Sequence, residues 1–258
     1  MLFGLGGSMR TFDGQSSTSY SRTRPMYPAE LYYWLSQQVP SSSVVWDCAC
    51  GTGQASVDLA AYFDRVEASD ISESQVTAAT PHRKVNYQVF PAEKTLYPDH
   101  YFDVVCVAHA LHWFNLEAFW AELKRVLKPG GMFVCWGYNW LQVGEAEDKA
   151  IAESVLPHLE TYWPAESRLL WNQYRDIKFP FELIDVPAFE LSCHWSVTQT
   201  LDFIRTWSAS QLRIQECGDD FLLDASPIIR DAWSEPAKKQ EIHLPFFVKA
   251  GRFAEANN

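Results

Sequence analysis

Apolar and polar positions along residues 40–138 predict strand and helix in regular succession. Short apolar runs predict buried strands, and apolar residues at every third or fourth position predict amphipathic helices. The predicted strands are 44–47, 66–70, 85–89, 102–108 and 132–136. The predicted helices are 29–38, 54–63, 73–79 and 116–127. This order indicates a doubly wound α/β fold with a mostly parallel sheet and right-handed crossovers.

The pattern changes after residue 138. Residues 139–180 are rich in Trp, Glu and Leu, and the helical spacing of Ile151, Val155 and Leu159 predicts a helical insertion over the pocket. Later predicted elements are a strand at 189–195, helices at 198–208 and 221–233, and a strand at 241–250. Pro245 places the last strand at a sheet edge, because proline cannot donate to the ladder. The complete sheet is therefore expected to have seven strands.

These patterns divide the chain into four segments. They are a flexible tail at 1–19, a ligand-binding core at 20–138, a helical cap insertion at 139–180, and the C-terminal part of the core with the last antiparallel strands at 181–258.

Composition excludes several classes of partner. The 258 residues carry a formal net charge of −11, which argues against a nucleic acid or an anionic membrane as the main partner. No apolar run reaches the roughly 18 residues of a membrane helix, and the first residues do not resemble a signal peptide. Cys48 and Cys50 are too close for a usual zinc pair. We expect a reduced, cytoplasmic protein without a structural metal.

The stretch Val44–Val57 (VVWDCACGTGQASV) carries the first chemical signal. A buried strand ends in Asp47, and a tight turn with Gly51 and Gly53 leads into a helix. Glycine lets the backbone take positive φ angles and approach a ligand closely, and the start of a helix presents unpaired N–H groups. This order predicts a nucleotide-type pocket at the carboxyl end of the sheet.

The pattern allows two interpretations of the cofactor, a nicotinamide dinucleotide and S-adenosylmethionine. A dinucleotide fold requires a third glycine, and Ser56 stands in its place. Asp47 would repel a pyrophosphate but attract the ammonium or sulfonium of S-adenosylmethionine. Asp70, at the end of the second strand, suits a ribose diol in either cofactor. The pattern favours S-adenosylmethionine over a nicotinamide cofactor.

Several segments resemble class I S-adenosylmethionine-dependent methyltransferases. The segments are DCACGTGQ, EASDIS, PAEKTLYPDHYFDVVCVAHALHWF and VLKPGGMFVCWGY. The N-terminal pattern that includes Tyr20, Arg24 and Pro25, together with residues 110–114 (ALHWF), is similar to the type-11 branch that includes trans-aconitate methyltransferase-like proteins. The resemblance is specific over residues 20–138 and weak over 180–250. It implies a Rossmann-like methyltransferase fold.

The resemblance also implies which residues bind the cofactor: Tyr20, Arg24, Asp47, Ala49, Gly51, Gly53, Asp70, Ile71, Ala92, Glu93 and Ala108. Asp47 would lie near the ammonium, with Gly51 and Gly53 along the methionine part. Asp70 would bind the ribose hydroxyls and Ile71 would pack on the adenine. Two positions depart from the family pattern: Ala49 replaces the usual first glycine, and Pro91 stands where an acidic residue is common.

The acceptor side is less determined by sequence. His109 and His112 follow a buried strand and are the candidate catalytic residues, with packing in the core as the competing interpretation. Trp113 and Tyr138 are expected to line a substrate pocket for a small-molecule methyl acceptor. A carboxylate acceptor would need no base, whereas a hydroxyl or amine would need one. The candidates for binding a carboxylate of the acceptor are Arg168, Arg175, Lys178 and Arg205.

Three functions therefore stay open at this point. A small-molecule methyltransferase is the first, a non-catalytic module that binds S-adenosylmethionine or S-adenosylhomocysteine is the second, and a nicotinamide-dependent oxidoreductase is the third. The chain is compatible with a monomer or a homodimer.

Overall fold

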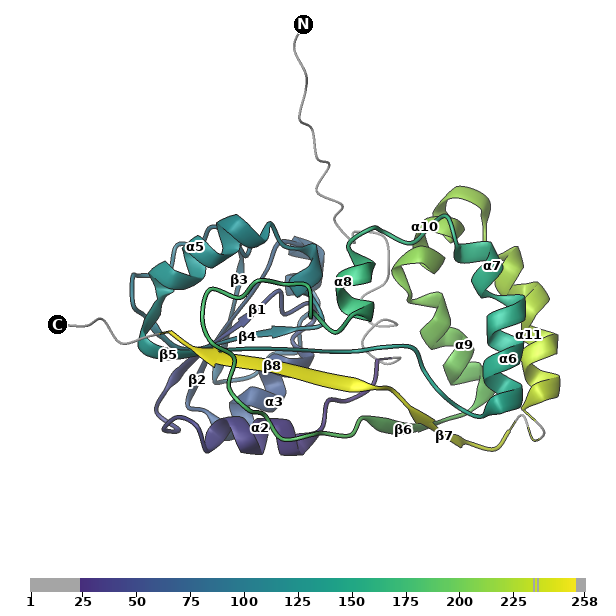
Figure 1. The fold of residues 1–258 in the computed structure, drawn as a ribbon, viewed down its shortest axis with the longest axis horizontal. Helices are drawn as coiled ribbons and strands as arrows, with labels where there is room; N and C mark the ends of the chain where they lie inside the picture. The colour runs from purple at the N-terminus through teal and green to yellow at the C-terminus, as the bar shows by residue number, and fades with distance from the viewer. Residues whose placement is uncertain (1–23, 234, 236, 254–258) are drawn as a thin grey trace, which may run out of the picture.

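The structure is a computed structural model that describes residues 24–233, 235 and 237–253. Its central sheet has six strands in the order β3-β2-β1-β4-β5-β8 (Figure 1). Neighbouring strands are parallel except β8, which runs antiparallel to β5. The strands of this sheet are β1 Val44–Cys48, β2 Arg65–Asp70, β3 Val85–Val89, β4 Phe102–Ala108, β5 Leu127–Tyr138 and β8 Phe246–Arg252.

Helices cover both faces of the sheet, as the near-continuous apolar strands predict. On one face, α2 (Ala29–Ser36) and α3 (Gln54–Tyr62) pack against Val45 of β1. On the other face, α5 (Leu116–Val126) packs against Trp46, the next residue of the same strand. Successive residues of a strand point to opposite faces, so β1 is buried on both sides and the predicted doubly wound α/β fold is confirmed.

Capping side chains begin the helices that flank the sheet. The Ser72 hydroxyl accepts a hydrogen bond from the Gln75 N–H at 3.4 Å and caps α4 (Glu73–Thr77). The Asn115 side chain accepts from Ala118 N–H at 3.3 Å at the start of α5. A short 3₁₀ helix, η1 (Leu111–Trp113), lies between β4 and α5.

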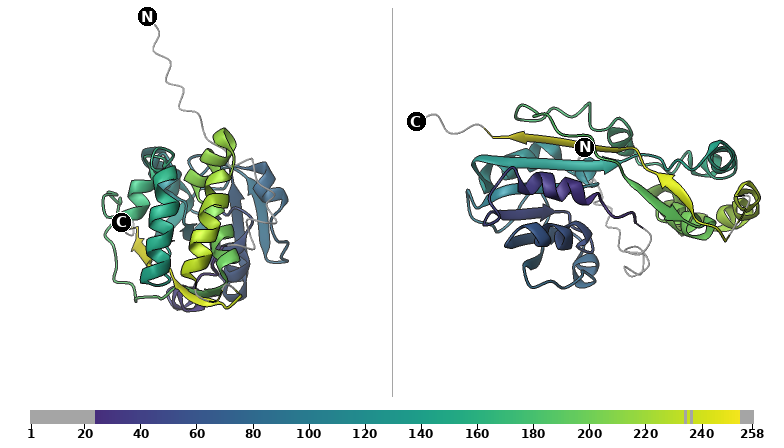
Figure 2. Two further views of the ribbon diagram at one scale, coloured as in Figure 1. Left: turned by 90° about the vertical axis from the view of Figure 1, so that its right-hand side faces the viewer. Right: turned by 90° about the horizontal axis from the view of Figure 1, so that it is seen from below.

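A second group of helices lies at one end of the molecule, beyond the carboxyl ends of the parallel strands (Figures 1 and 2). These cap helices are α6 Glu145–Ser154, α7 Leu156–Leu159, α9 Val197–Arg205, α10 Ser208–Cys217 and α11 Asp220–Ala232. They share a hydrophobic core, in which Ile151 of α6, Phe203 of α9 and Ile229 of α11 are buried. The short helix α8 (Ser167–Trp171) lies between this group and the sheet.

The sheet has six strands where the sequence pattern predicts seven. The segment expected as a strand at 189–195 forms β6 (Ser192–Trp195), which pairs with β7 (Gln240–His243) in a separate antiparallel ribbon. The single strand expected at 241–250 divides into β7 and β8 around Pro245, whose missing N–H interrupts the ladder. Its C-terminal half, β8, lies at the predicted sheet edge.

The cap also draws on more of the chain than residues 139–180. Helices α9 to α11 belong to the segment that the sequence pattern assigns to the core, yet α11 packs against α6. The apolar faces of these helices bury one another, and periodicity alone does not state which partner an amphipathic helix will cover. The predicted tail at 1–19 falls outside the described residues. No helix among the described residues combines the length and apolar character that crossing a membrane requires.

Candidate active site

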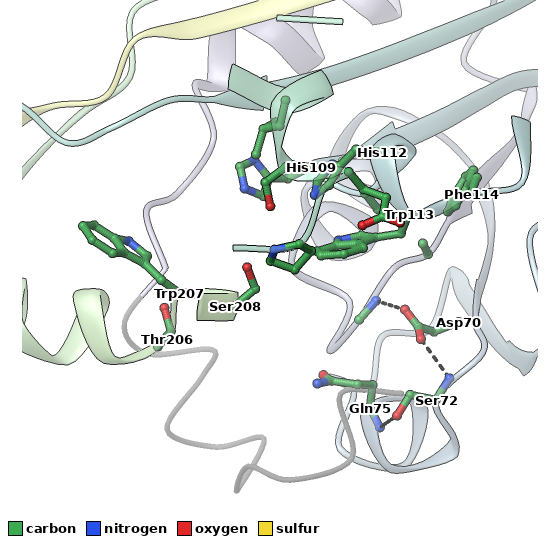
Figure 3. A pocket seen from close by; sticks show the side chains of 18 of the residues that line it. Asp70, Ser72, Gln75, His109, His112, Trp113, Phe114, Thr206, Trp207 and Ser208 are labelled. Atoms are coloured by element: carbon green, nitrogen blue, oxygen red, sulfur yellow. Dashed lines mark hydrogen bonds between the residues drawn. The ribbon is translucent and has the colours of Figure 1, made fainter. Parts of the chain in front are cut away.

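A cavity of about 1530 Å³ lies between the carboxyl ends of the parallel strands and the cap (Figure 3). The chain runs outward from β1 to β3 and then returns to place β4 on the other side of β1. Ligands of doubly wound sheets bind at such a switch in strand order. The volume exceeds the roughly 300–1,000 Å³ of a single ligand pocket, so the cavity has room for two molecules.

The turn between β1 and α3 brings backbone groups to the cavity. Three of its residues have left-handed φ angles: Ala49 at 58°, Gly51 at 55° and Gly53 at 79°. For Ala49, where the family pattern has glycine, this conformation costs about 1 kcal/mol. A Cβ on Gly51 would have one neighbour within 4 Å, the Gln75 Oε1 atom at 3.8 Å. Gly51 therefore leaves space in the cavity wall for close approach of a ligand.

Gly53 has a structural role that the sequence does not reveal. It precedes α3 and is absent from the cavity wall, in contrast to the expectation that it lines the methionine part. A Cβ at this position would overlap with the phenol of Tyr87. The glycine is required here for packing of β3 against the turn.

Asp47 lies behind the turn and does not line the cavity, and its place near the ammonium stays a prediction. It is fully buried, and its Oδ2 accepts a hydrogen bond from the Ser56 hydroxyl at 2.5 Å. Its Oδ1 has no hydrogen-bond partner among the described residues. Burial, partly offset by the Ser56 bond, raises the pKa of Asp47 to about 7. The carboxyl group would therefore respond strongly to a nearby positive charge.

Asp70 connects the end of β2 to the turn (Figure 3). Its Oδ2 accepts from the Gly51 N–H at 2.9 Å, and its Oδ1 accepts from the Ser72 N–H at 2.9 Å. The side chain lines the cavity, and burial raises its pKa. Each carboxylate oxygen has a further lone pair for a ligand hydroxyl.

The other predicted cofactor residues on described elements also line this end of the cavity. They are Ala49, Ile71, Ala92, Glu93 and Ala108. The Ile71 side chain is 42 % exposed, so an apolar surface is open there. The Glu93 Oε1 accepts from the Asn115 N–H at 2.9 Å, which ties the segment after β3 to the start of α5. Pro91 lies in the wall as well and offers no hydrogen-bond donor.

Arg24 joins the core to the cap at the cavity wall. Its Nη1 donates to the Tyr138 hydroxyl at 2.7 Å, and its Nη2 donates to the Thr206 carbonyl at 3.4 Å. The guanidinium also lies 5.6 Å from the centre of the Phe203 ring. The predicted partner of Arg24 in the N-terminal segment, Tyr20, lies outside the described residues.

His109 stands at the end of β4 and is held by Tyr138. The two rings stack with centroids 4.1 Å apart, and the Tyr138 N–H donates to His109 Nδ1 at 3.4 Å. Because Nδ1 accepts this bond, the proton of the neutral ring lies on Nε2. Burial, with smaller contributions from Arg24 and His112, holds the pKa of His109 well below its ordinary value. His109 is therefore a hydrogen-bond donor toward the cavity.

His112 lies in η1, and its Nδ1 is 2.9 Å from the Tyr174 hydroxyl. Both side chains are almost fully buried. Gln173 and Tyr174 follow α8 with left-handed φ angles of 54° and 57°, and this turn carries Tyr174 to the histidine. Burial lowers the pKa of His112 to about 3, so the ring is neutral at pH 7. When Nδ1 donates to Tyr174, Nε2 is left as a base.

The remaining wall of the cavity is aromatic and comes largely from the cap. The predicted residues Trp113 and Tyr138 line it, and so do Trp140, Trp163, Trp171, Phe203 and Trp207. The sequence shows that residues 139–180 are rich in tryptophan, but it does not reveal that Trp207 lies in the cavity wall. Nor does it reveal Tyr174, which is outside the wall and contacts His112. Arg168, Arg175, Lys178 and Arg205, the candidates for a carboxylate, do not line the cavity.

No three His, Cys, Asp or Glu side chains on the described part of the chain are arranged to hold a metal ion. All six cysteines lie on described elements and are free thiols.

Comparisons with known proteins agree with this geometry. A family model described as a methyltransferase domain matches residues 46–135, which include the turn, Asp70 and both histidines. A solved structure from Anaeromyxobacter dehalogenans, assigned as a type II methyltransferase, has a TM-score of 0.81 and 36% identity, and the match covers 90% of this chain and 99% of that chain.

Two further relatives come from eukaryotes. A protein of Dictyostelium discoideum assigned as a methyltransferase is 28% identical over 91% of this chain and 92% of its own length. A protein of Saccharomyces cerevisiae assigned as an S-adenosylmethionine-dependent methyltransferase is 29% identical over 47% of this chain and 45% of its own length.

The turn yields a prediction on stability. Gly51→Ala should lower the free energy of unfolding by about 1 kcal/mol, because it adds only left-handed strain. Gly53→Ala should lower it by at least about 2 kcal/mol, because the same strain is joined by overlap with Tyr87. Urea denaturation of the two variants measures this difference. Equal losses would show that Tyr87 moves aside without cost.

Burial of His112 yields a prediction on pH. Between pH 6.5 and about 3 the unfolded chain binds a proton at His112 that the folded chain excludes. Stability should therefore fall on acidification by about 1.4 kcal/mol per pH unit from this group. Urea denaturation repeated from pH 7 to pH 4.5 measures the slope of stability against pH. The slope of His112→Gln should be smaller than that of wild type, because the variant lacks this contribution. Tyr174→Phe is the control and should keep the wild-type slope, because burial alone lowers the pKa. A His112→Gln slope equal to that of wild type would refute the assignment.

Proposed function

Because this chain belongs to the class I S-adenosylmethionine-dependent methyltransferases, we propose that it transfers a methyl group from S-adenosylmethionine to a small-molecule acceptor held under the cap. A carboxylate or a hydroxyl group is the proposed acceptor. The observation that carries the proposal is one cavity that joins the turn and Asp70 at one end to two histidines and an aromatic cap wall at the other. A cap that encloses the acceptor suits a small molecule better than a macromolecule.

The residues at the turn fit the cofactor. We assign the ribose hydroxyls to Asp70, which already orders the turn through the Gly51 N–H. Ile71 offers its exposed side chain to the adenine, with Ala92 and Glu93 at the adenine edge. Ala49, Gly51 and Ala108 border the methionine part. Asp47 would act on the ammonium from behind the turn through its charge.

Methyl transfer from a sulfonium is a displacement for which the cofactor supplies the reactive carbon. The contribution of this chain is to align the acceptor and to exclude water, and alignment alone can lower the barrier by several kcal/mol. For a hydroxyl acceptor, the proton must leave as the new bond forms. We assign the contact with that proton to His112, because the Nε2 atom of the neutral His109 ring already carries a proton. A pKa of about 3 makes His112 a weak base at pH 7, so its Nε2 would accept a hydrogen bond from the hydroxyl while the proton goes on to water. A carboxylate acceptor would need neither group as a base.

Other assignments remain predictions. The motifs at Arg24 and 110–114 favour the trans-aconitate methyltransferase-like branch. A cytoplasmic location and a monomer or homodimer are the expected setting of the enzyme.

The first test is calorimetric titration of the protein with S-adenosylmethionine, S-adenosylhomocysteine and NAD in parallel. Micromolar binding of the first two and none of NAD is the expected result. Binding of NAD, or of none of the three, would overturn the proposal.

Asp70→Ala should weaken binding of S-adenosylhomocysteine by about 10- to 100-fold, since hydrogen bonds to a charged group contribute about 1.5–3 kcal/mol. The matched control is Glu73→Ala, which removes the same charge from an exposed position three residues along the chain. The control should bind as wild type does. Comparable affinity of the two variants would remove Asp70 from the site.

The position of Asp47 predicts proton release on cofactor binding. At pH 6.5 about three quarters of a carboxyl group with a pKa of about 7 is protonated. A cofactor ammonium nearby should lower that pKa and release about half a proton, which calorimetry in two buffers of different ionisation enthalpy detects. Asp47→Asn should abolish most of the release, whereas Glu73→Ala should not. A binding enthalpy independent of buffer in the wild type would refute this role of Asp47.

A further inference from the structure

The end of the cavity remote from the turn is built from four tryptophans that come from separate parts of the cap. Trp140 follows β5, Trp163 precedes α8, Trp171 ends α8, and Trp207 precedes α10. The Trp140 ring lies 5.1 Å from Trp163, 5.6 Å from Trp171 and 5.2 Å from Trp207, measured between ring centroids. The indoles contact one another and so make this end of the cavity wall aromatic.

This wall is continuous with the residues at the reacting end. Ring contacts run from His109 to Tyr138 at 4.1 Å, from Tyr138 to Phe203 at 6.3 Å, and from Phe203 to Trp207 at 6.2 Å. Trp207 then contacts Trp140. In Figure 3, Trp207, Thr206 and Ser208 lie on the cap side of the cavity, apart from His109 and His112. A molecule with its reactive group near the histidines would therefore lay its body along aromatic rings.

The charges of the cavity wall oppose an anionic acceptor. Arg24 is the single Lys or Arg among the described residues of the wall, and its guanidinium is already bonded to Tyr138 and to the Thr206 carbonyl. The cap end of the wall carries the acids Glu166 and Glu216. Apart from Arg24, the described residues of the wall offer no cationic side chain to a carboxylate that is buried on the indoles, and an unpaired buried charge is costly. Both acids are exposed at the rim, where solvent screens their attraction for a cation.

We propose that the tryptophan wall centred on Trp140 binds the body of an uncharged, planar aromatic acceptor that carries a hydroxyl group. This inference rests on the proposed function and narrows its acceptor to the hydroxyl class. Trp140 lines the cavity and is 36 % exposed, so part of the residue is open to a ligand. Indole faces bind flat apolar rings through dispersion and burial of apolar area. The hydroxyl group then lies toward His109 and His112.

The chemical step balances without a further reactant. The hydroxyl oxygen of the acceptor forms a bond to the methyl carbon while the carbon–sulfur bond breaks, and that electron pair stays on sulfur as a neutral thioether. The hydroxyl donates a hydrogen bond to His112 Nε2, and its proton is released to water. The products are an aryl methyl ether, S-adenosylhomocysteine and one proton.

Three probes with one ring system test the charge selection. They are 2-naphthol, 2-naphthoate and 2-naphthylmethylamine, which are neutral, anionic and cationic at pH 7. Binding to the protein saturated with S-adenosylhomocysteine is measured by calorimetry, and methyl transfer to 2-naphthol is measured with isotope-labelled S-adenosylmethionine. We expect 2-naphthol to bind at least about tenfold more tightly than either charged probe and to be methylated on oxygen. Tighter binding of the naphthoate or the amine, or no binding of any probe, would overturn the inference.

A pair of variants tests the wall itself. Trp140→Leu should weaken 2-naphthol binding about tenfold, because the ligand ring loses its stacking partner. Trp34→Leu is the control, since Trp34 is also a partly exposed tryptophan but lies on α2 outside the cavity wall. Trp140→Phe should recover part of the affinity, which separates loss of stacking from loss of fold. Equal effects at Trp34 and Trp140 would contradict the assignment.

Binding of S-adenosylhomocysteine separates the two levels of the proposal. If every protein in the series binds it and 2-naphthol does not bind, the acceptor class is wrong and the methyltransferase assignment stands. If wild type fails to bind it, the proposed function itself is wrong.

Discussion

The turn between β1 and α3 depends on a hydrogen bond from the neighbouring strand. Three of its residues take left-handed φ angles, which non-glycine residues rarely adopt, and one of the three is Ala49. Asp70 at the end of β2 accepts the Gly51 N–H and so holds the turn in the shape that opens its backbone to the cavity. Tyr87 of β3 closes the other side against Gly53. Three parallel strands therefore position one short turn, and the cavity begins there.

Burial controls the electrostatics around that turn. Asp47 belongs to β1, and its buried carboxyl group accepts a hydrogen bond from Ser56 in the first turn of α3. Burial raises the pKa of this carboxyl group, so a larger fraction of it is protonated at neutral pH. The histidines at the end of β4 stay neutral for the same reason. The two histidines in the cavity wall therefore bring no positive charge that would oppose a cationic cofactor. Their neutral rings also suit an acceptor that becomes nucleophilic only when its proton leaves.

The cap completes the cavity through polar and aromatic contacts with the core. Arg24 connects the end of β5 to the carbonyl of Thr206, and Tyr174 reaches from the segment after α8 to His112. Tyr174 is buried with the sheet-side core, so the segment after α8 links the cap to the core and orients the His112 ring.

Local patterns in the sequence determined the doubly wound sheet, the glycine turn, Asp70 and the histidine pair. Each of these depends on neighbours within a few residues or on the rule that parallel strands end at the same edge. The tertiary structure alone decided three other features. Asp47 lies behind the turn, because burial depends on how α3 packs and not on the motif. Helices α9 to α11 join the cap, Trp207 lines the cavity, and Tyr174 contacts His112. These residues are far apart in sequence and meet only because of how the apolar faces of the elements pack. The six-stranded count follows from the same cause: β6 and β7 pair with one another beside the cap, and Pro245 interrupts the ladder before β8 rejoins the sheet.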